Sequence, residues 1–462
     1  MTVAPLPPRE TVVVRGAWVL GMSGDPPLED GAVRIQGGAI TDVGSYNRLR
    51  AVDPSTPVVG DGFGIVMPGM VNVHTHLSEA LVPGMGSEKT LYEWGEDIVT
   101  PVSRNLTAEI AREGTRLKAI EMIRSGITFV NDMFVHSNPG TRASLGVAEG
   151  LNEVGLRATV SFGAEDALGE TSDNPAMPVD EILEEHHDLA RIAGKSELLG
   201  FRYGIGTLLG QSDELLEAGT AECRRNGWGV HTHLAEVREE IVHASLRWGR
   251  RPVPQAVALG LLDVPTLAAH LIWITQEDIH LLAAHGASVA HNPVANMILG
   301  SGVCPLARLA SAGLAIGIGT DGPASNDSQN MFEAVKMAAL LQKVHHLDPA
   351  VMSARDALEM ATLGGARALG VDSLVGSLEP GKRADIVLLD PTVELATIHD
   401  PYQQVVYCAG PRSVSNVWVD GRRLLADGRL TTIDEADQIA RGRALARSVA
   451  ARAGLRGVHS FL

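Results

Sequence analysis

Two histidines separated by one residue close an apolar run, and their spacing suits metal binding. The run VNVHTHLSEA covers residues 71–80 and contains His74 and His76. On a β-strand, residues i and i+2 face the same way, so both imidazoles would project from one side and could chelate one ion. Core histidines bonded to backbone are the alternative, and the pair alone does not decide between the two.

Other residues that bind metals or transfer protons follow later apolar runs. HTHLAE closes a run near residue 234, and a histidine or an aspartate closes each of the next three runs. The residues concerned are His231, His233, Glu236, His270, His291 and Asp321. Scattered core histidines would not recur at the ends of successive strands. The pattern therefore favours one composite site built where the strands end.

Eight apolar runs that can form strands alternate with amphipathic segments. The runs are IVMPGMVNVH (65–74), ITFVND (127–132), RATVSF (157–162), GFRYGIG (200–206), GWGVHTHL (227–234), TLAAHL (266–271), ASVAHN (287–292) and LAIGIGTD (314–321). One intervening segment, AEIAREGTRLKAIEMIRSG, repeats apolar residues at spacings of three and four and ends at Gly126, as a helix would. Eight βα units predict a closed (β/α)8 TIM barrel, whose active site forms at the C-terminal strand ends.

Both ends of the chain carry shorter strand-like runs. TVVVRGAWVL and GAVRIQGGAITDVG open the sequence, and Gly37-Gly38 in the second run suits a tight hairpin. ADIVLLD and SVSNVWVDGRRLLADGRL repeat this pattern near the other end. We expect an α/β protein in which residues 1–65 and 373–462 form one small β-sandwich domain with a C-terminal helix. The barrel, residues 66–372, would be inserted between them.

The composition argues against several classes of partner. Lys and Arg number 38 and Asp and Glu 55, and the formal charge of −17 disfavours nucleic acid and anionic membranes. The three cysteines, Cys223, Cys304 and Cys408, are far apart and indicate neither a disulfide framework nor a cysteine zinc site. The sequence shows no run of 18 apolar residues and no signal-peptide pattern. We expect a soluble, cytoplasmic protein.

Several motifs together resemble the amidohydrolase superfamily, in particular its branch of aminohydrolases that act on N-heteroaromatic rings. They are HTH after PGMVN, VHTHLAE, AAHL, AHNPVANMILGSG and GIGTDGPASND, and the resemblance covers about residues 10–430. It implies the same barrel and terminal β-sandwich. It also implies that one divalent metal, zinc first and iron as the alternative, is held by His74, His76, His233 and Asp321. Binuclear relatives add a bridging Lys, Glu or Cys at the fourth strand, and GFRYGIGT offers none.

The resemblance also implies hydrolytic deamination at a C–N bond of the ring. A bound cation lowers the pKa of its water from about 15.7 toward about 7, so that hydroxide can attack the amino-bearing carbon and release ammonia. Asp321 would accept the water proton and pass it to the leaving nitrogen, while His270 would orient the hydroxide. Glu236 would protonate a ring nitrogen. Its alternative role is that of a solvent-facing carboxylate in the first turn of a helix.

Four further residues are expected to contact substrate, again by resemblance. Glu93 would bind a sugar hydroxyl and Trp94 would lie against the heterocycle, although a buried Trp that anchors its loop is the alternative. His291 and Asn296 would shape the pocket.

The remaining histidines carry weaker indications. His231 shares the face of His233 and is either a group behind the metal ligands or a packed barrel histidine. His186 and His187 belong to an amphipathic helix and are expected on its solvated face.

The strongest resemblance is to S-adenosylhomocysteine and methylthioadenosine deaminases, which makes a purine nucleoside such as an adenosine derivative the expected small-molecule substrate. Those deaminases carry arginine after the third strand and histidine after the fourth, where this chain has RATVSFGAED and YGIGTLLGQS. The part of the substrate beyond the ring is therefore left open. An s-triazine hydrolase that displaces amine or chloride, or another cyclic C–N hydrolase, is the alternative function. A non-catalytic scaffold protein with the same barrel is the least expected function, because such a protein would have lost the metal-ligating residues that this chain retains. Related enzymes form homo-oligomers, but no segment here reads as an interface.

Overall fold

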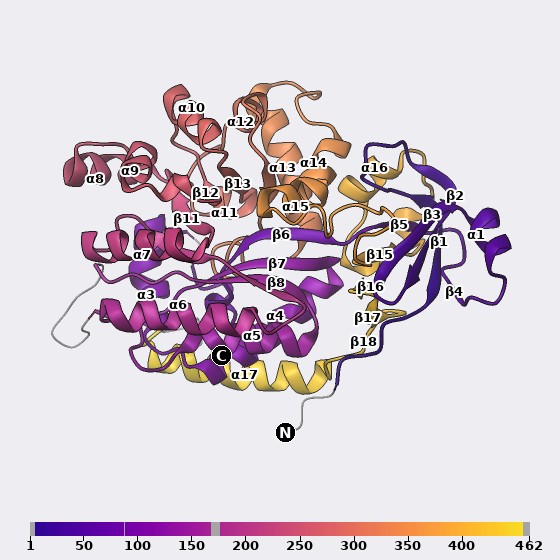
Figure 1. The fold of residues 1–462 in the computed structure, drawn as a ribbon, viewed down its shortest axis with the longest axis horizontal. Helices are drawn as coiled ribbons and strands as arrows, with labels where there is room; N and C mark the ends of the chain where they lie inside the picture. Colours follow the sequence, from indigo (N-terminus) through magenta and orange to yellow (C-terminus); the bar gives the residue numbers. More distant parts are fainter. Residues whose placement is uncertain (1–4, 87, 168–175, 456–462) are drawn as a thin grey trace.

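The computed structural model describes residues 5–86, 88–167 and 176–455, which form a barrel of parallel strands with a separate sheet at one end (Figure 1). The barrel strands pair in the orders β6-β7-β8-β9 and β10-β11-β12-β13-β14. Their bounds are β6 (Met70–Thr75), β7 (Ile127–Phe134), β8 (Arg157–Phe162), β9 (Leu199–Phe201), β10 (Tyr203–Thr207), β11 (Val230–Leu234), β12 (Thr266–His270), β13 (Ser288–His291) and β14 (Ile316–Ile318).

The two parallel sheets are joined on both sides. A parallel bridge connects Ala164 to Ile205, and the N–H of Asp321 donates to the carbonyl of His74 over 2.9 Å. β9 and β10 are halves of one strand, interrupted at Arg202. The predicted eight-stranded barrel is therefore confirmed, and its C-terminal strand ends lie together at one rim.

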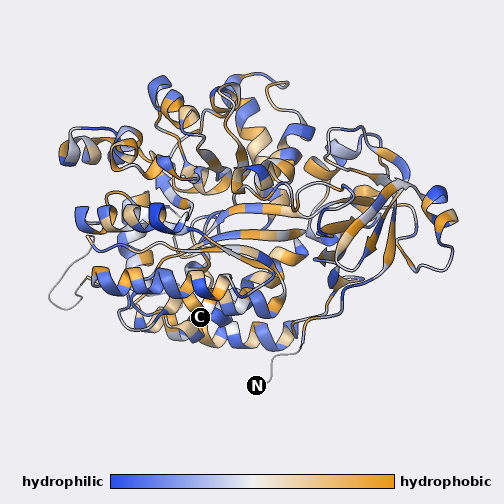
Figure 2. Ribbon diagram, in the orientation of Figure 1, coloured by the Kyte–Doolittle hydropathy of each residue, from blue (hydrophilic) through white to orange (hydrophobic). Residues whose placement is uncertain are grey.

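Helices follow the barrel strands and cover them from outside. They are α4 (Ala108–Arg124), α5 (Ala143–Val154), α6 (Val179–Ala193), α7 (Asp213–Asn226), α8 (Arg238–Trp248), α9 (Pro252–Leu259), α10 (Gln276–Ala284), α11 (Pro293–Ile298), α12 (Leu306–Ser311), α13 (Met331–His346), α14 (Ala354–Met360) and α15 (Leu363–Leu369). Figure 2 shows apolar residues along β6 to β8 and at intervals along these helices, as expected where a helix buries one face. Within the described residues, no helix has the length and apolar character needed to cross a membrane.

The sheet at the end of the barrel is assembled from both ends of the chain. Its strands are β1 (Val12–Val19), β2 (Leu28–Gln36), β3 (Ala39–Ser45), β4 (Val58–Val59), β5 (Ile65–Pro68), β15 (Ile386–Leu389), β16 (Val414–Val419), β17 (Arg422–Ala426) and β18 (Arg429–Leu430). Gly37 and Gly38 turn between β2 and β3 with positive φ, as predicted. Short helices α1 (Tyr46–Val52), α2 (Leu91–Trp94), α3 (Thr100–Ser103) and α16 (Pro401–Gln403) fill connections, and α17 (Glu435–Arg452) packs on α4.

The first predicted strand, residues 65–74, is two strands in two different sheets. β5 pairs with β15 of the end sheet, whereas β6 is the first barrel strand. The break falls at Gly69, whose N–H donates to the carbonyl of Asp385 over 2.9 Å. A Cβ at Gly69 would lie 1.9 Å from Thr128 Oγ1, so the close approach of the two sheets requires glycine here.

The expectation of a solvated face was wrong for His186. It is fully buried on the barrel side of α6, and its ring stacks on Tyr203 with centroids 3.9 Å apart. Ile182 and Leu189, one turn away on either side, are buried as well, so His186 lies within the apolar stripe of the helix. His187, the next residue, is half exposed and pairs with Glu222 at 3.2 Å.

Candidate metal centre

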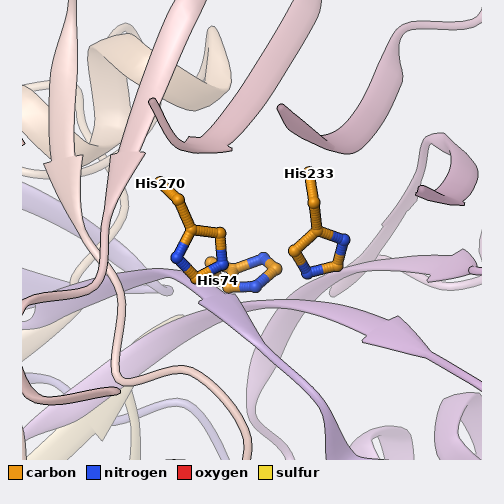
Figure 3. A group of neighbouring side chains, drawn as sticks. All are labelled: His74, His233 and His270. Carbon is orange, nitrogen blue, oxygen red and sulfur yellow. The ribbon is translucent and has the colours of Figure 1, made fainter. Parts of the chain in front are cut away.

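Five side chains from four barrel strands meet at the C-terminal rim. His74 and His76 come from the end of β6, His233 from β11, His270 from β12, and Asp321 follows β14. Figure 3 shows the rings of His74, His233 and His270 turned toward one another. Potential ligand atoms of His74, His233 and His270 lie within 4.8 Å of one another, as do those of His74, His76 and Asp321. The strand-end arrangement expected from the sequence is present for all five.

The hydrogen bonds of His76 and His233 determine which ring nitrogen carries a proton. Nδ1 of His76 lies 2.7 Å from the carbonyl of Met133, and Nδ1 of His233 contacts the carbonyl of Gly206. Because a carbonyl can only accept, both Nδ1 atoms must donate, which leaves a lone pair on each Nε2. These two Nε2 atoms face each other at 3.1 Å. Two facing lone pairs repel unless a cation lies beside them, so the donor set fits a metal ion.

His74 and Asp321 complete the group. Nε2 of His74 is buried without a hydrogen-bond partner among the described residues and lies 3.4 Å from Oδ1 of Asp321. The same oxygen lies 3.5 Å from Nε2 of His76. Burial lowers the pKa of His76 to about 4 and that of His233 well below its ordinary value, so both rings are neutral, as metal ligands must be. Three neutral imidazoles and one carboxylate are a donor set typical of a catalytic zinc site.

Unusual backbone geometry places Asp321 and His270. Both have positive φ, 64° and 73°, a region that costs energy for residues other than glycine. The hydroxyl of Thr75 and the amide of Gln329 donate to the carbonyl of Asp321 over 2.9 and 2.8 Å and hold this conformation. In this backbone conformation the Asp321 carboxylate points toward His74 and His76.

His270 links the metal group to Glu236. Its Nδ1 donates to Oδ1 of Asn296 over 2.8 Å, and its Nε2 lies 3.6 Å from Asp321 Oδ2 and 3.5 Å from Glu236 Oε2. Burial opposes a charge on His270, but these two carboxylates outweigh it and raise its pKa. Burial raises the pKa of Glu236, which favours a protonated carboxyl close to the metal group.

Two buried carboxyl groups at the rim were not anticipated from the sequence. Glu240 accepts from the N–H groups of Ala235 and Glu236 over 2.9 and 2.8 Å, and burial raises its pKa to about 7. These two hydrogen bonds fix the turn that carries Glu236. In the sequence, the only signal for this contact was the spacing of four residues between the two glutamates. Glu79 accepts from the N–H of Ala324 over 3.0 Å beside Asp321, and burial raises its pKa well above the usual range.

The residues expected to contact substrate differ in their placement. Asn296 is buried against His270, and His291 is buried with neither ring nitrogen bonded to a described residue. Trp94 is buried and its indole N–H donates to the carbonyl of Ala324 over 2.9 Å, within the loop that follows Asp321. Glu93 is not brought to the metal group. Its exposed carboxylate accepts from the N–H and the hydroxyl of Thr90 and caps α2.

This chain is similar over most of its length to a known family and to proteins named as deaminases. The Amidohydrolase family matches residues 65–424. A 5'-deoxyadenosine deaminase of Methanothermobacter thermautotrophicus is 37% identical over 92% of this chain and 96% of its own. A 5-methylthioadenosine/S-adenosylhomocysteine deaminase of Thermodesulfovibrio yellowstonii is 31% identical over 93% and 97%.

Solved structures with the same fold include a deaminase and a chlorohydrolase. An adenosine deaminase from Xanthomonas campestris with bound zinc superposes with a TM-score of 0.89 at 30% identity and covers 97% of this chain and 100% of its own. The zinc complex of the atrazine chlorohydrolase TrzN from Arthrobacter aurescens superposes with a TM-score of 0.87 at 26% identity over 94% and 100%. The expected barrel with a terminal β domain is therefore confirmed, and the chain belongs to the amidohydrolase family.

Proposed function

We propose that the protein is a metal-dependent hydrolase that deaminates the purine ring of an adenosine derivative. The observation that carries this proposal is the convergence of three imidazole lone pairs and a carboxylate at the rim. Beside them lies His270, and the buried carboxyl group of Glu236 is 3.5 Å from its Nε2. The curated relatives named above act on adenosine derivatives and align over more than nine-tenths of the chain, which supports the choice of ring.

His74, His76, His233 and Asp321 would hold one divalent ion, with zinc favoured because it is bound in the two similar structures. Such an ion lowers the pKa of a coordinated water to about 7 and so supplies a nucleophile at neutral pH. The fourth strand ends in Tyr203–Thr207 without Lys, Glu or Cys, which supports a mononuclear centre.

The protein's own residues would move the protons. Asp321 accepts a proton from the attacking water and delivers it to the departing amine, while His270 hydrogen-bonds the oxygen that becomes the ring carbonyl. Glu236, protonated because it is buried, donates to a ring nitrogen and makes the adjacent carbon electrophilic. When the hydroxyl becomes the ring carbonyl, the second proton of the water returns to Glu236, so that overall water replaces the amino group and ammonia leaves.

Ammonia release across a panel of purified compounds tests this function. The panel contains 5'-deoxyadenosine, methylthioadenosine, S-adenosylhomocysteine, guanine and aminotriazines, each assayed with zinc-loaded protein. We expect turnover of the adenosine derivatives. Turnover confined to aminotriazines would instead assign the triazine hydrolase activity, and a failure of every compound in the panel to release ammonia would contradict deamination.

The surroundings of the site favour adenosine derivatives with an uncharged 5' substituent. Glu165 follows β8, accepts from the hydroxyl of Thr207 over 3.2 Å and lies against Gly206, whose carbonyl binds His233. Burial raises the pKa of Glu165 to about 7. Burial, and then the charges of Glu240, Glu239, Glu236 and Glu165, raise the pKa of Tyr92.

If the carboxylate of the S-adenosylhomocysteine tail, rather than its ammonium group, lies beside Glu165, it would meet repulsion there. We expect kcat/KM for 5'-deoxyadenosine and methylthioadenosine to exceed that for S-adenosylhomocysteine by about tenfold or more at pH 8. Glu165→Gln should narrow this ratio, because it removes a negative charge while it keeps an acceptor for Thr207. Steady-state assays of the three substrates with the wild type and with Glu165→Gln measure this ratio of kcat/KM values. The same ratio in both proteins would show that Glu165 does not face the 5' substituent.

A further inference from the structure

His231 connects a metal ligand to the barrel interior through consecutive hydrogen bonds. Its Nε2 lies 2.7 Å from Nδ1 of His74, and its Nδ1 lies 3.2 Å from Oγ of Ser161 and 3.2 Å from Nδ2 of Asn131. His231, Ser161 and Asn131 are all fully buried. The contact pattern of His74 thus differs from that of His76 and His233, whose Nδ1 atoms donate to backbone carbonyls.

The far end of this chain of contacts offers His231 both an acceptor and a donor. The hydroxyl of Ser161 donates to the carbonyl of Asp132 over 2.7 Å, so its oxygen is left to accept. Asn131 Nδ2 donates to the carbonyl of Val73 over 2.8 Å. Nδ1 of His231 therefore faces one acceptor, the oxygen of Ser161, and one donor, the second N–H of Asn131, each at 3.2 Å. When Nδ1 donates to Ser161, the lone pair of the neutral ring is left on Nε2, and metal binding by His74 selects this arrangement.

The near end has a matching polarity when His74 binds a metal. A ring that coordinates through Nε2 must carry its proton on Nδ1, and that proton needs an acceptor because Nδ1 is buried. Nε2 of His231 is that acceptor. The opposite arrangement, with the proton on Nε2 of His231, would leave His74 with its proton on Nε2, directed at Asp321 and blocking the metal.

We propose that His231 is a positioning residue that holds His74 in the tautomer required for metal binding, with Ser161 as the end of the chain. Partners of this kind fix the ring orientation and the basicity of a histidine ligand, and their loss typically costs about 10- to 100-fold in metal affinity. The proposal depends on the metal centre and not on the substrate. Zinc binding without any deamination would refute the proposed function and leave this inference standing.

Chelator competition with Zn²⁺ on purified protein tests the role. His231→Phe keeps a planar ring and removes the acceptor, so we expect zinc to bind about 10- to 100-fold more weakly. His231→Gln can place an amide oxygen near the position of Nε2, and we expect it to bind zinc at least about threefold more tightly than His231→Phe. His186→Phe is the matched control, since His186 is equally buried but stacks outside the barrel on Tyr203.

The affinity result overturns the proposal if folded His231→Phe protein binds zinc as tightly as His186→Phe protein, or if the Gln variant is as weak as the Phe variant. Should His231→Phe fail to fold, ¹⁵N-histidine NMR of the zinc-loaded wild type decides the question. We expect one-bond N–H couplings at Nδ1 of His74 and at Nδ1 of His231. A proton on Nε2 of His231 would overturn the assignment.

Discussion

Replacing Glu236 by Gln is expected to lower kcat/KM for ring deamination by about 10³-fold, within the range found for loss of a general acid or base. The Gln side chain can still hydrogen-bond a ring nitrogen, but it cannot transfer a proton. Its amide also preserves the packing against Ser301 and His270, which lie 3.4 and 3.5 Å from the carboxylate. Zinc content should be unchanged because Glu236 is not a ligand. Steady-state kinetics together with elemental analysis of the same preparation measure both quantities.

Glu239→Gln is the matched control, since Glu239 is exposed in the first turn of α8, three residues further along the chain. It should retain wild-type kinetics. If the Glu236→Gln protein kept its activity, Glu236 would not be the group that protonates the ring. That result would favour a hydrolase whose reaction does not require protonation of an aromatic nitrogen.

Asp321→Asn should give the largest loss, because one carboxylate serves two purposes. Oδ1 lies 3.4 and 3.5 Å from Nε2 of His74 and His76, where it would bind the ion, and its charge also makes it the proton acceptor. We expect kcat/KM to fall by about 10⁴-fold or more. Zinc affinity should fall as well, because the neutral amide is a poorer ligand.

Assays over a range of zinc concentrations separate these two roles. Saturating zinc should refill the Asp321→Asn site without restoring turnover, because the proton acceptor is still missing. Recovery of more than about a tenth of wild-type kcat under these conditions would limit Asp321 to metal binding.

The barrel and the convergence of side chains at its rim could be predicted because their signals are local. His74 and His76 lie two residues apart on one strand, and His233, His270 and Asp321 each close an apolar run, so the period-two rule and the common rim bring them together. Neither inference requires knowledge of how distant side chains pack.

What could not be predicted depends on contacts between distant segments. Pro68-Gly69 marks a break within the run at 65–74, but only the approach of Thr128 and Asp385 to Gly69 shows that the two halves belong to different sheets. Glu93 lies next to Trp94 in the sequence, but its carboxylate is used by Thr90 to cap α2 while the indole turns inward to Ala324. His186 is buried because the helix turns that position toward Tyr203, whereas His187, only one residue further along the chain, faces solvent.

The most direct test of the metal centre is anomalous diffraction from crystals of the zinc-loaded protein at the zinc absorption edge. We predict one anomalous peak per chain, bound by Nε2 of His74, His76 and His233 and by the carboxylate of Asp321. The absence of a peak, two peaks at the rim, or a single peak bound by other side chains would contradict the account.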